Sequence, residues 1–262
     1  MKRILTSLLF VLLLCNFINS QTLKSDEKAE AIIKKAVEKL GGERYLQVKS
    51  VVGKGNYTTL VAGQLHQLIG FVDVIVFPDR ERTEFKTSGV KNIQANVGAT
   101  GWLFDGAEEA VKDQNKRQIE DFRRGMRVSV DNLLRGYWRA EEGVALSYVG
   151  RRQAGVGKRN DVVRLTYADG FAVEFEFSDD GFPAKSVYKR TNDEGAELKE
   201  EDRYAQFVNV QGIYAPFIVD HFINGNHTSR INYTSIEFNK TIPDSIFNKP
   251  SDAKTARKDL KL

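Results

Sequence analysis

The chain has 262 residues, 39 basic against 35 acidic side chains, a formal net charge of +4 and 41% hydrophobic residues. These values are typical of a globular protein with one large domain or two small ones. Aromatic residues make up 10%, and 21 glycines and 5 prolines are present, which excludes disordered, collagen-like and low-complexity sequences. Because Cys15 is the single cysteine, an intrachain disulfide and a cysteine-based zinc site are also excluded.

The first twenty residues have the pattern of a secretory signal peptide. Lys2 and Arg3 precede an unbroken apolar run at 8–14, which is much shorter than the ~20 residues that a membrane-spanning helix needs. Ser20 provides a small residue for cleavage. We therefore predict a signal peptide over 1–20 and an exported, periplasmic protein.

Lipid anchoring through Cys15 is the less favoured alternative. This cysteine stands where the apolar run ends, as in a bacterial lipoprotein, but Leu13 and Leu14 precede it instead of small residues. Four N-x-T sequons would carry glycans in a eukaryotic secreted protein, and in a bacterium they are ordinary strand residues. They begin at Asn56, Asn226, Asn232 and Asn239.

An amphipathic helix is predicted over 25–40. Its apolar residues recur with helical spacing, and Asp26 and Glu27 stand in the first turn, where carboxylates favour the positive end of the helix dipole. Gly41 and Gly42 end it, because glycine adopts the left-handed conformation at little cost. The apolar stripe consists of Ala29, Ile32, Ile33, Ala36, Val37 and Leu40.

The rest of the chain follows a period of two, broken once by helical spacing. Residues with high strand propensity gather between turns rich in Gly, Pro, Asn and Asp. The first group of strands is predicted at 47–60, 64–77, 80–87, 90–97 and 99–105. Two helical stretches follow, at 114–124 and 129–137. The second group of strands is predicted at 144–153, 160–168, 171–177, 184–190, 198–210, 216–223 and 229–238.

This order of elements predicts a mainly β protein with helices (α+β). Short connections favour one curled antiparallel sheet, an unclosed β-barrel covered by the N-terminal helix and the mid-chain helical segment, over alternating βαβ units. Because no linker rich in Pro, Gly or Ser interrupts it, we expect a single domain over 21–250. A charged, flexible tail is expected over 251–262.

Catalytic signatures are absent from the sequence. It contains no G-x-S-x-G, H-E-x-x-H or C-x-x-C motif. The loop Gly155-Val156-Gly157-Lys158 lacks the glycine spacing and the following Ser or Thr of a phosphate-binding loop, so a basic hairpin loop is the better interpretation. We therefore expect no enzymatic activity and no cofactor.

The three histidines do not form a convincing metal or catalytic site. They are His66, His221 and His227, and the last two flank the turn Asn224-Gly225. With a two-residue turn, Phe222 faces His227 and the two imidazoles point to opposite sides of the sheet. A three-residue loop would bring them to one face, where a third ligand would still be needed. No metal is expected.

The charged residues are interpreted as solvated surface. Glu174 and Glu176 fall on the wet face of the strand at 171–177, whose other face is apolar. The basic pairs fit acidic head groups, an acidic partner or a plain exposed face, and export makes nucleic acid an improbable partner. These pairs are Arg123-Arg124, Arg151-Arg152 and Lys158-Arg159.

A curled sheet that does not close leaves an apolar inner surface, which side chains, a helix or a ligand must fill. An acyl chain would bind there without directional chemistry. Alternation cannot separate the wall of such a cavity from plain core. Ile33 and Val37 are helical candidates for this surface. The candidate ligand-binding residues are Val72, Val74, Val76, Trp102, Phe104, Leu133, Leu134, Phe171, Val173, Phe175 and Phe177.

The order of elements resembles the outer-membrane lipoprotein-sorting (LolA/LolB-like) superfamily. The resemblance extends over nearly the whole mature chain and rests on structural motifs of moderate specificity. Its most telling part is the closing segment, in which the last strand gives way to an Asn, a buried Phe and a Pro. The motifs are the helix ending in Leu40-Gly41-Gly42, then Gly101-Trp102-Leu103-Phe104-Asp105, Gly212-Ile213-Tyr214-Ala215-Pro216, and the run from Phe238 through Asn239 and Phe247 to Pro250.

This resemblance implies an unclosed β-barrel with a helical lid that works in the periplasm on acylated lipoproteins or lipids, with transient membrane contact. Related members instead sense envelope stress, so the fold does not determine the ligand. Our first hypothesis is a non-catalytic carrier. The alternative is an envelope sensor or protein-interaction domain whose cavity is filled and which binds an envelope protein. An undetected hydrolase ranks below both.

Overall fold

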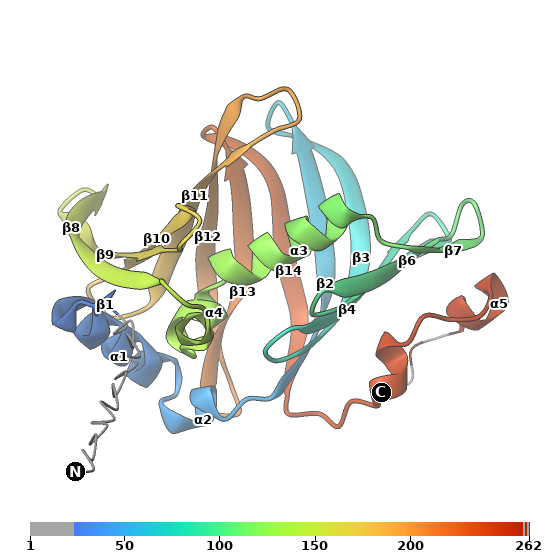
Figure 1. The fold of residues 1–262 in the computed structure, drawn as a ribbon, viewed down its shortest axis with the longest axis horizontal. Coiled ribbons are helices and arrows are strands. Elements are labelled where there is room, and N and C mark those ends of the chain that lie inside the picture. Colours follow the sequence, from blue (N-terminus) through green and yellow to red (C-terminus); the bar gives the residue numbers. More distant parts are fainter. Residues whose placement is uncertain (1–23, 259, 261) are drawn as a thin grey trace, which may run out of the picture.

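The fold is that of a computed structural model, which describes residues 24–258, 260 and 262. The predicted signal peptide and Cys15 lie outside the described residues. In the described part, fourteen strands form one sheet in the order β1-β8-β9-β10-β11-β12-β13-β14-β2-β3-β4-β5-β6-β7 (Figure 1). Every neighbouring pair is antiparallel except β1 and β8, which are parallel. The sheet curls without closing, which confirms the predicted unclosed barrel.

Twelve of the fourteen strands agree closely with the predicted ranges, whereas β1 and β7 were not predicted. In chain order they are β1 Lys24–Ser25, β2 Ser50–Val61, β3 Gln64–Val76, β4 Arg80–Thr87, β5 Val90–Val97, β6 Thr100–Asp105, β7 Ala110–Asp113, β8 Ala145–Gly155, β9 Lys158–Thr166, β10 Ala172–Phe177, β11 Pro183–Thr191, β12 Glu197–Val210, β13 Ile213–Ile223 and β14 Asn226–Phe238. The helices are α1 Glu27–Leu40, α2 Glu43–Leu46, α3 Lys116–Val128, α4 Val130–Leu134 and α5 Ala253–Ala256, with 3-10 turns η1 Tyr137–Ala140 and η2 Asp244–Phe247.

Helix α1 forms as its sequence predicts. The Asp26 carboxylate accepts hydrogen bonds from the backbone N–H groups of Lys28 (2.8 Å) and Ala29 (3.2 Å), which satisfies donors at the helix start. Gly41 ends the helix with a φ of 132°. The stripe of Ala29, Ile33, Ala36 and Leu40 is buried, and it packs against α4, β8, β9 and β13.

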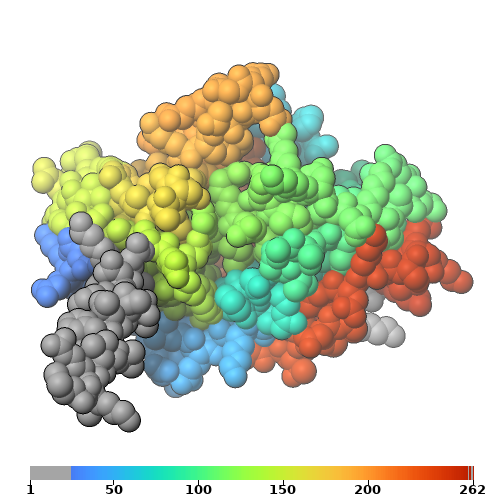
Figure 2. Space-filling view, in the orientation of Figure 1, coloured from blue at the N-terminus to red at the C-terminus, as the bar shows by residue number. Residues whose placement is uncertain are grey.

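Helices α3 and α4 connect β7 to β8 and lie over one face of the sheet, which we call the inner face (Figure 1). A capping box starts α3: the Asn115 side chain accepts from the Gln118 N–H, and the Gln118 side chain accepts from the Asn115 N–H. Of the thirteen residues of α3, Phe122 and Val128 are buried. Its outward side chains occupy the middle of the space-filling view (Figure 2).

The opposite, outer face of β2 to β6 is covered by the chain that follows β14. Ile246 and Phe247 pack on Val52 and Val74, and the carbonyl of Ile246 accepts a 2.6 Å hydrogen bond from Arg82 Nη1. The segment expected to be a flexible tail contains α5, whose Ala256 is 2% exposed against the outer-face cluster of β5 and β6. The apolar residues of this segment are sparse, but the outer face offers them a matching apolar surface.

Strand β8 stands next to the edge of the sheet, because β1 pairs with only its first two residues, Ala145 and Leu146. Two register shifts against β9 interrupt the remainder of β8, at Tyr148/Gly150 and at Gln153/Gly155. Each shift adds local twist to the strand.

Candidate functional site

A cavity of about 210 Å³ lies between the inner face and its helical cover. Strands β2, β3 and β12 to β14 form one wall, and the end of α1, α2 and the α3–α4 junction form the other. Most of the surface is apolar, with a few polar groups at its edges. The apolar lining includes Leu40, Val51, Ile75, Val130, Phe207, Ile213, Val219, Ile236 and Phe238.

A glycine in a strand shapes the wall of this cavity. A Cβ atom at Gly53 would lie 2.6 Å from the ring of Tyr233, so the ring lies directly on β2 only because position 53 has no side chain. The same ring makes an edge-to-face contact with Phe71, with 5.4 Å between the ring centres. Gly53 and Tyr233 both line the cavity, and together they set its shape on the β2–β14 side.

Arg135 is the buried cation at one corner of the cavity. Its Nε donates to Asp131 Oδ1 (2.7 Å), and its Nη1 donates to the carbonyls of Tyr45 (2.5 Å) and Val48 (3.2 Å). The guanidinium also lies over the rings of Tyr45 and Phe77. The Tyr45 hydroxyl donates to the same Asp131 oxygen at 2.7 Å, and burial raises the pKa of Tyr45. This corner is internally satisfied and holds the helices on the sheet.

Two carboxyl groups lie together at the β3 side of the cavity, one on β3 and one on the neighbouring strand β4. Asp73 lines the cavity and is 9% exposed, and its Oδ1 accepts a 2.7 Å hydrogen bond from the Thr83 hydroxyl. The second carboxyl, Glu81, is hydrogen-bonded to Asp73. Burial raises the pKa of both groups, and the charge of Asp73 raises the pKa of Glu81 further. The pair therefore retains a proton more readily than an exposed pair would.

A second polar group lies further along the inner face, on β11 to β13. Tyr188 donates to Glu200 Oε2 at 2.5 Å, and His221 Nδ1 lies 2.6 Å from Asp202 Oδ1. Burial lowers the pKa of His221, but its hydrogen bond to Asp202 and the nearby carboxylates outweigh that effect and raise the pKa overall. Burial also raises the pKa of Tyr188.

His227 is separate from His221 and has other partners. The register pairs Phe222 with His227 across the two-residue turn, as predicted for that turn length, and their rings stack with 4.8 Å between centres. His227 Nε2 lies 3.0 Å from Asp220 Oδ1. Within residues 24–258, 260 and 262, no three His, Cys, Asp or Glu side chains are grouped as metal ligands.

None of the eleven candidate ligand-binding residues lines the 210 Å³ cavity. The first five lie on the outer face, where the chain after β14 covers them: Val72, Val74, Val76, Trp102 and Phe104. The other six belong to the main core beneath α1 and α4: Leu133, Leu134, Phe171, Val173, Phe175 and Phe177. Both faces of β3 are covered and carry apolar residues. The alternation of side chains along β3 therefore does not tell which face borders a cavity.

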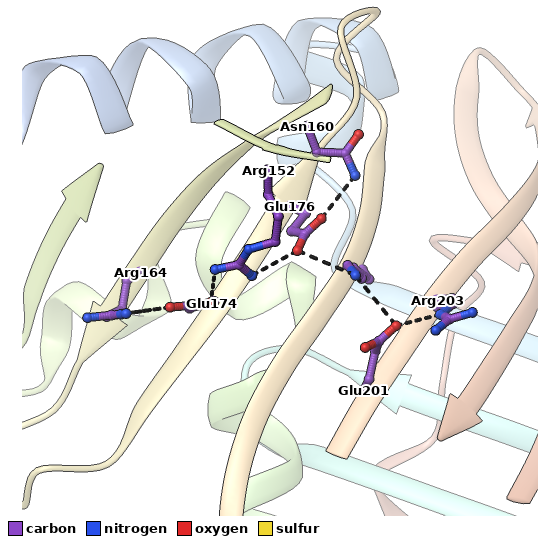
Figure 3. A network of polar contacts seen from close by, with 8 residues as sticks. Arg152, Asn160, Arg164, Glu174, Glu176, Glu201 and Arg203 are labelled. Carbon is purple, nitrogen blue, oxygen red and sulfur yellow. Dashed lines mark hydrogen bonds and ion pairs between the residues drawn. The ribbon is translucent and has the colours of Figure 1, made fainter. Parts of the chain in front are cut away.

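The expected wet face of β10 carries an ion network instead (Figure 3). Glu176 is 0% exposed, and its carboxylate accepts from Arg152 (2.9 Å) and Asn160 (3.1 Å), with Lys185 Nζ at 3.5 Å. Arg152 also binds Glu174. The interpretation of Glu176 as a solvated surface residue was therefore wrong. Neighbouring strands supply enough cations to bury its charge.

The unclosed, helix-covered barrel is similar to folds of known structure. Three solved structures share it: a LolA superfamily protein of Nitrosomonas europaea (TM-score 0.57, 15% identity), a DUF1329 family protein of Desulfovibrio piger (0.59, 11%) and an outer membrane lipoprotein-sorting protein domain of Vibrio parahaemolyticus (0.55, 13%). Each match covers 84% of this chain and 97% of the other. No protein-family model and no curated protein sequence matches the chain.

These comparisons agree with the resemblance seen in the sequence, and at such low identity they establish the fold alone. Among the described helices, none combines the length and the hydrophobicity of a membrane-spanning segment.

Proposed function

We propose that the protein is a non-catalytic periplasmic carrier that binds an acyl chain of a lipid or of a lipid-modified protein. The observation that supports this most is the mainly apolar cavity of about 210 Å³ beneath the helical cover. A dry apolar cavity of roughly 150 Å³ is large enough to bind benzene, so this one admits a short hydrocarbon segment. Each buried methylene contributes about 0.8 kcal/mol.

A longer chain requires the cover to move. Pockets for drug-sized ligands measure roughly 300–1,000 Å³, and this cavity is below that range. Helix α3 is the element best suited to move, because only Phe122 and Val128 of its thirteen residues are buried. We infer that cargo enters as α3 lifts from the inner face, during transient contact with a membrane or an acylated lipoprotein.

The same cavity volume supports a second candidate. A sensor or protein-interaction domain of this fold needs no room for cargo, and a cavity already reduced by Tyr233 and Phe207 suits that role. In that case an envelope protein would be the partner, bound at the surface.

Native mass spectrometry of the protein purified from its own envelope distinguishes the carrier from the interaction domain. Co-purified acyl-bearing species are expected for the carrier, whereas a bare protein mass together with a bound protein contradicts it and favours the interaction domain.

A matched pair of variants adds a direct test. Val219 lines the cavity, whereas Val208, on the neighbouring strand, is 41% exposed. Val219→Trp fills the cavity, so binding of a fluorescent fatty acid is expected to weaken at least tenfold, while Val208→Trp leaves it unchanged. Equal affinity of the two variants would contradict binding in this cavity.

A further inference from the structure

A second hollow lies on the outer face, away from the cavity described above. It measures about 530 Å³ and is bordered by β2, β3, β4 and the chain that follows β14. We call it the outer groove. Four lysines, Lys54, Lys86, Lys91 and Lys240, line it together with a single carboxylate, Glu84. The lining therefore carries an excess of positive charge.

The one carboxylate of the outer groove is already engaged. Glu84 binds Arg82 at 2.5 Å and Lys91 at 3.2 Å, and Lys240 lies 3.2 Å from Glu237. Lys54 and Lys86 are exposed and form no ion pair with any residue that the structure describes. Two ammonium groups thus border the groove without an ion pair to any described residue.

The floor of the outer groove is open because of a glycine. A Cβ atom at Gly70 would meet only the carbonyl oxygen of Lys86, at 3.6 Å, and its backbone is outside the left-handed region. Neither crowding nor conformation therefore explains glycine at this position. A side chain there would project into the groove. Val72, Leu260 and Leu262 provide an apolar wall beside the lysines.

We infer that the outer groove binds a single anionic lipid, with its phosphate head group at Lys54 and Lys86 and its chain along the apolar wall. Lysine recognises phosphate as a point charge, and a volume within the usual range of ligand pockets suits one amphiphile. An acidic protein segment would satisfy the lysines but would leave no role for the apolar wall or the open floor. This site is separate from the inner cavity and does not depend on the carrier function.

Titration calorimetry of the full chain with monomeric lysophosphatidic acid tests this inference, with lysophosphatidylcholine of the same chain length as the neutral comparison. Preferential binding of the anionic lipid is expected. The double variant Lys54→Gln/Lys86→Gln is expected to weaken that binding at least tenfold, and Gly70→Leu is expected to do the same by filling the floor.

Lys34 and Lys158 are exposed lysines of α1 and β9, so Lys34→Gln/Lys158→Gln is the matched control and should bind normally. Equal affinity for both lipids, an equal loss in the control, or unchanged binding by the two outer-groove variants would overturn the inference. If inorganic phosphate displaced the lipid with the same affinity, the lysines would bind free phosphate. If the protein bound anionic vesicles but no monomeric lipid, the lysines would bind a bilayer surface. Either result would overturn a single-lipid site. Val219→Trp should leave this binding unchanged, which separates its outcome from that of the carrier test.

Discussion

The two ends of the inner face differ in how they are filled. Under α1 and α4, β8 to β10 form a closely packed core in which Val163, Leu165, Val173 and Phe175 are all 0% exposed. Under the α3–α4 junction, β12 to β14, β2 and β3 surround the cavity instead. The strands at both ends carry apolar inner residues, so the difference comes from the helices: α1 contributes a continuous apolar stripe, whereas α3 contributes little.

The largest expected effect tests the packed end. Phe175→Ala should lower the free energy of unfolding by about 3–5 kcal/mol, because it removes a fully buried ring from a close-packed site. Phe207→Ala, at the cavity, should cost less than half as much, since this ring is only half-buried and borders empty space. Chemical denaturation measures both. Equal losses would mean that the two ends are packed alike.

The outer face of the packed end depends on the burial of Glu176. Glu176→Gln should cost about 1–3 kcal/mol in denaturation experiments, because Arg152 and Lys185 lose the charge that they share. The exposed Glu38→Gln in α1 is the control and should change stability very little. If Glu176→Gln left the free energy of unfolding unchanged, the ion network would contribute nothing to the stability of the packed end.

Gly53→Ala sharpens the comparison at the cavity end. The new methyl group would overlap the Tyr233 ring, so the ring must move into the cavity, at a cost of about 1–3 kcal/mol. Fatty-acid binding should weaken together with stability. Gly125→Ala in α3, where nothing lies within 4 Å of the added atom, should be tolerated. Unchanged fatty-acid binding by Gly53→Ala would exclude Tyr233 from the cargo site.

The carboxyl pair predicts a pH dependence located at the cavity end. Because the folded pKa values of Asp73 and Glu81 are raised to about 6 and about 8, the folded state binds more protons than the unfolded state between about pH 4 and pH 8. Their contribution to stability is thus greatest at low pH and is lost as the pH rises. Asp73→Asn should flatten this decline in thermal unfolding, and the exposed Glu194→Gln should not. If stability fell more steeply with rising pH in Asp73→Asn than in the wild type, Asp73 would not be a source of this pH dependence.

The smallest effect concerns the attachment of α3. Arg117 of α3 forms an ion pair with Asp193 in the β11–β12 turn, and both side chains are mostly exposed. Arg117→Ala should leave global stability within experimental error, because solvent and salt screen such a pair. It should instead speed the exchange of amide hydrogens in α3. If α3 exchanges at the wild-type rate, this ion pair does not hold the cover closed.

Much of the fold was predictable because its signals are local. The stripe of α1 and the alternation of the long strands are set by side chains a few residues apart. Strand β7, Ala110–Asp113, was missed because four residues are too few to show alternation, and its structure comes from pairing with β6. Helix α2, Glu43–Leu46, is equally short.

The cavity was not predictable in the same way, because it depends on which face each helix covers. Residues Val72, Val74 and Val76 were the natural candidates in β3, yet the chain after β14 covers them. One signal did exist: Asp73 is a carboxylate inside an otherwise apolar run, and a polar residue there marks the face that borders a cavity. The outer groove had no comparable signal, because its lysines come from separate strands.

The edge of the sheet at β8 has a consequence for behaviour at high concentration. A barrel that stays open exposes backbone donors and acceptors that invite pairing between molecules and, in time, fibrous aggregates. The register shifts at Tyr148/Gly150 and Gln153/Gly155 distort that edge, so its donors and acceptors do not form a regular row. A second copy of the chain would therefore meet an irregular strand, with which it could form few consecutive backbone hydrogen bonds.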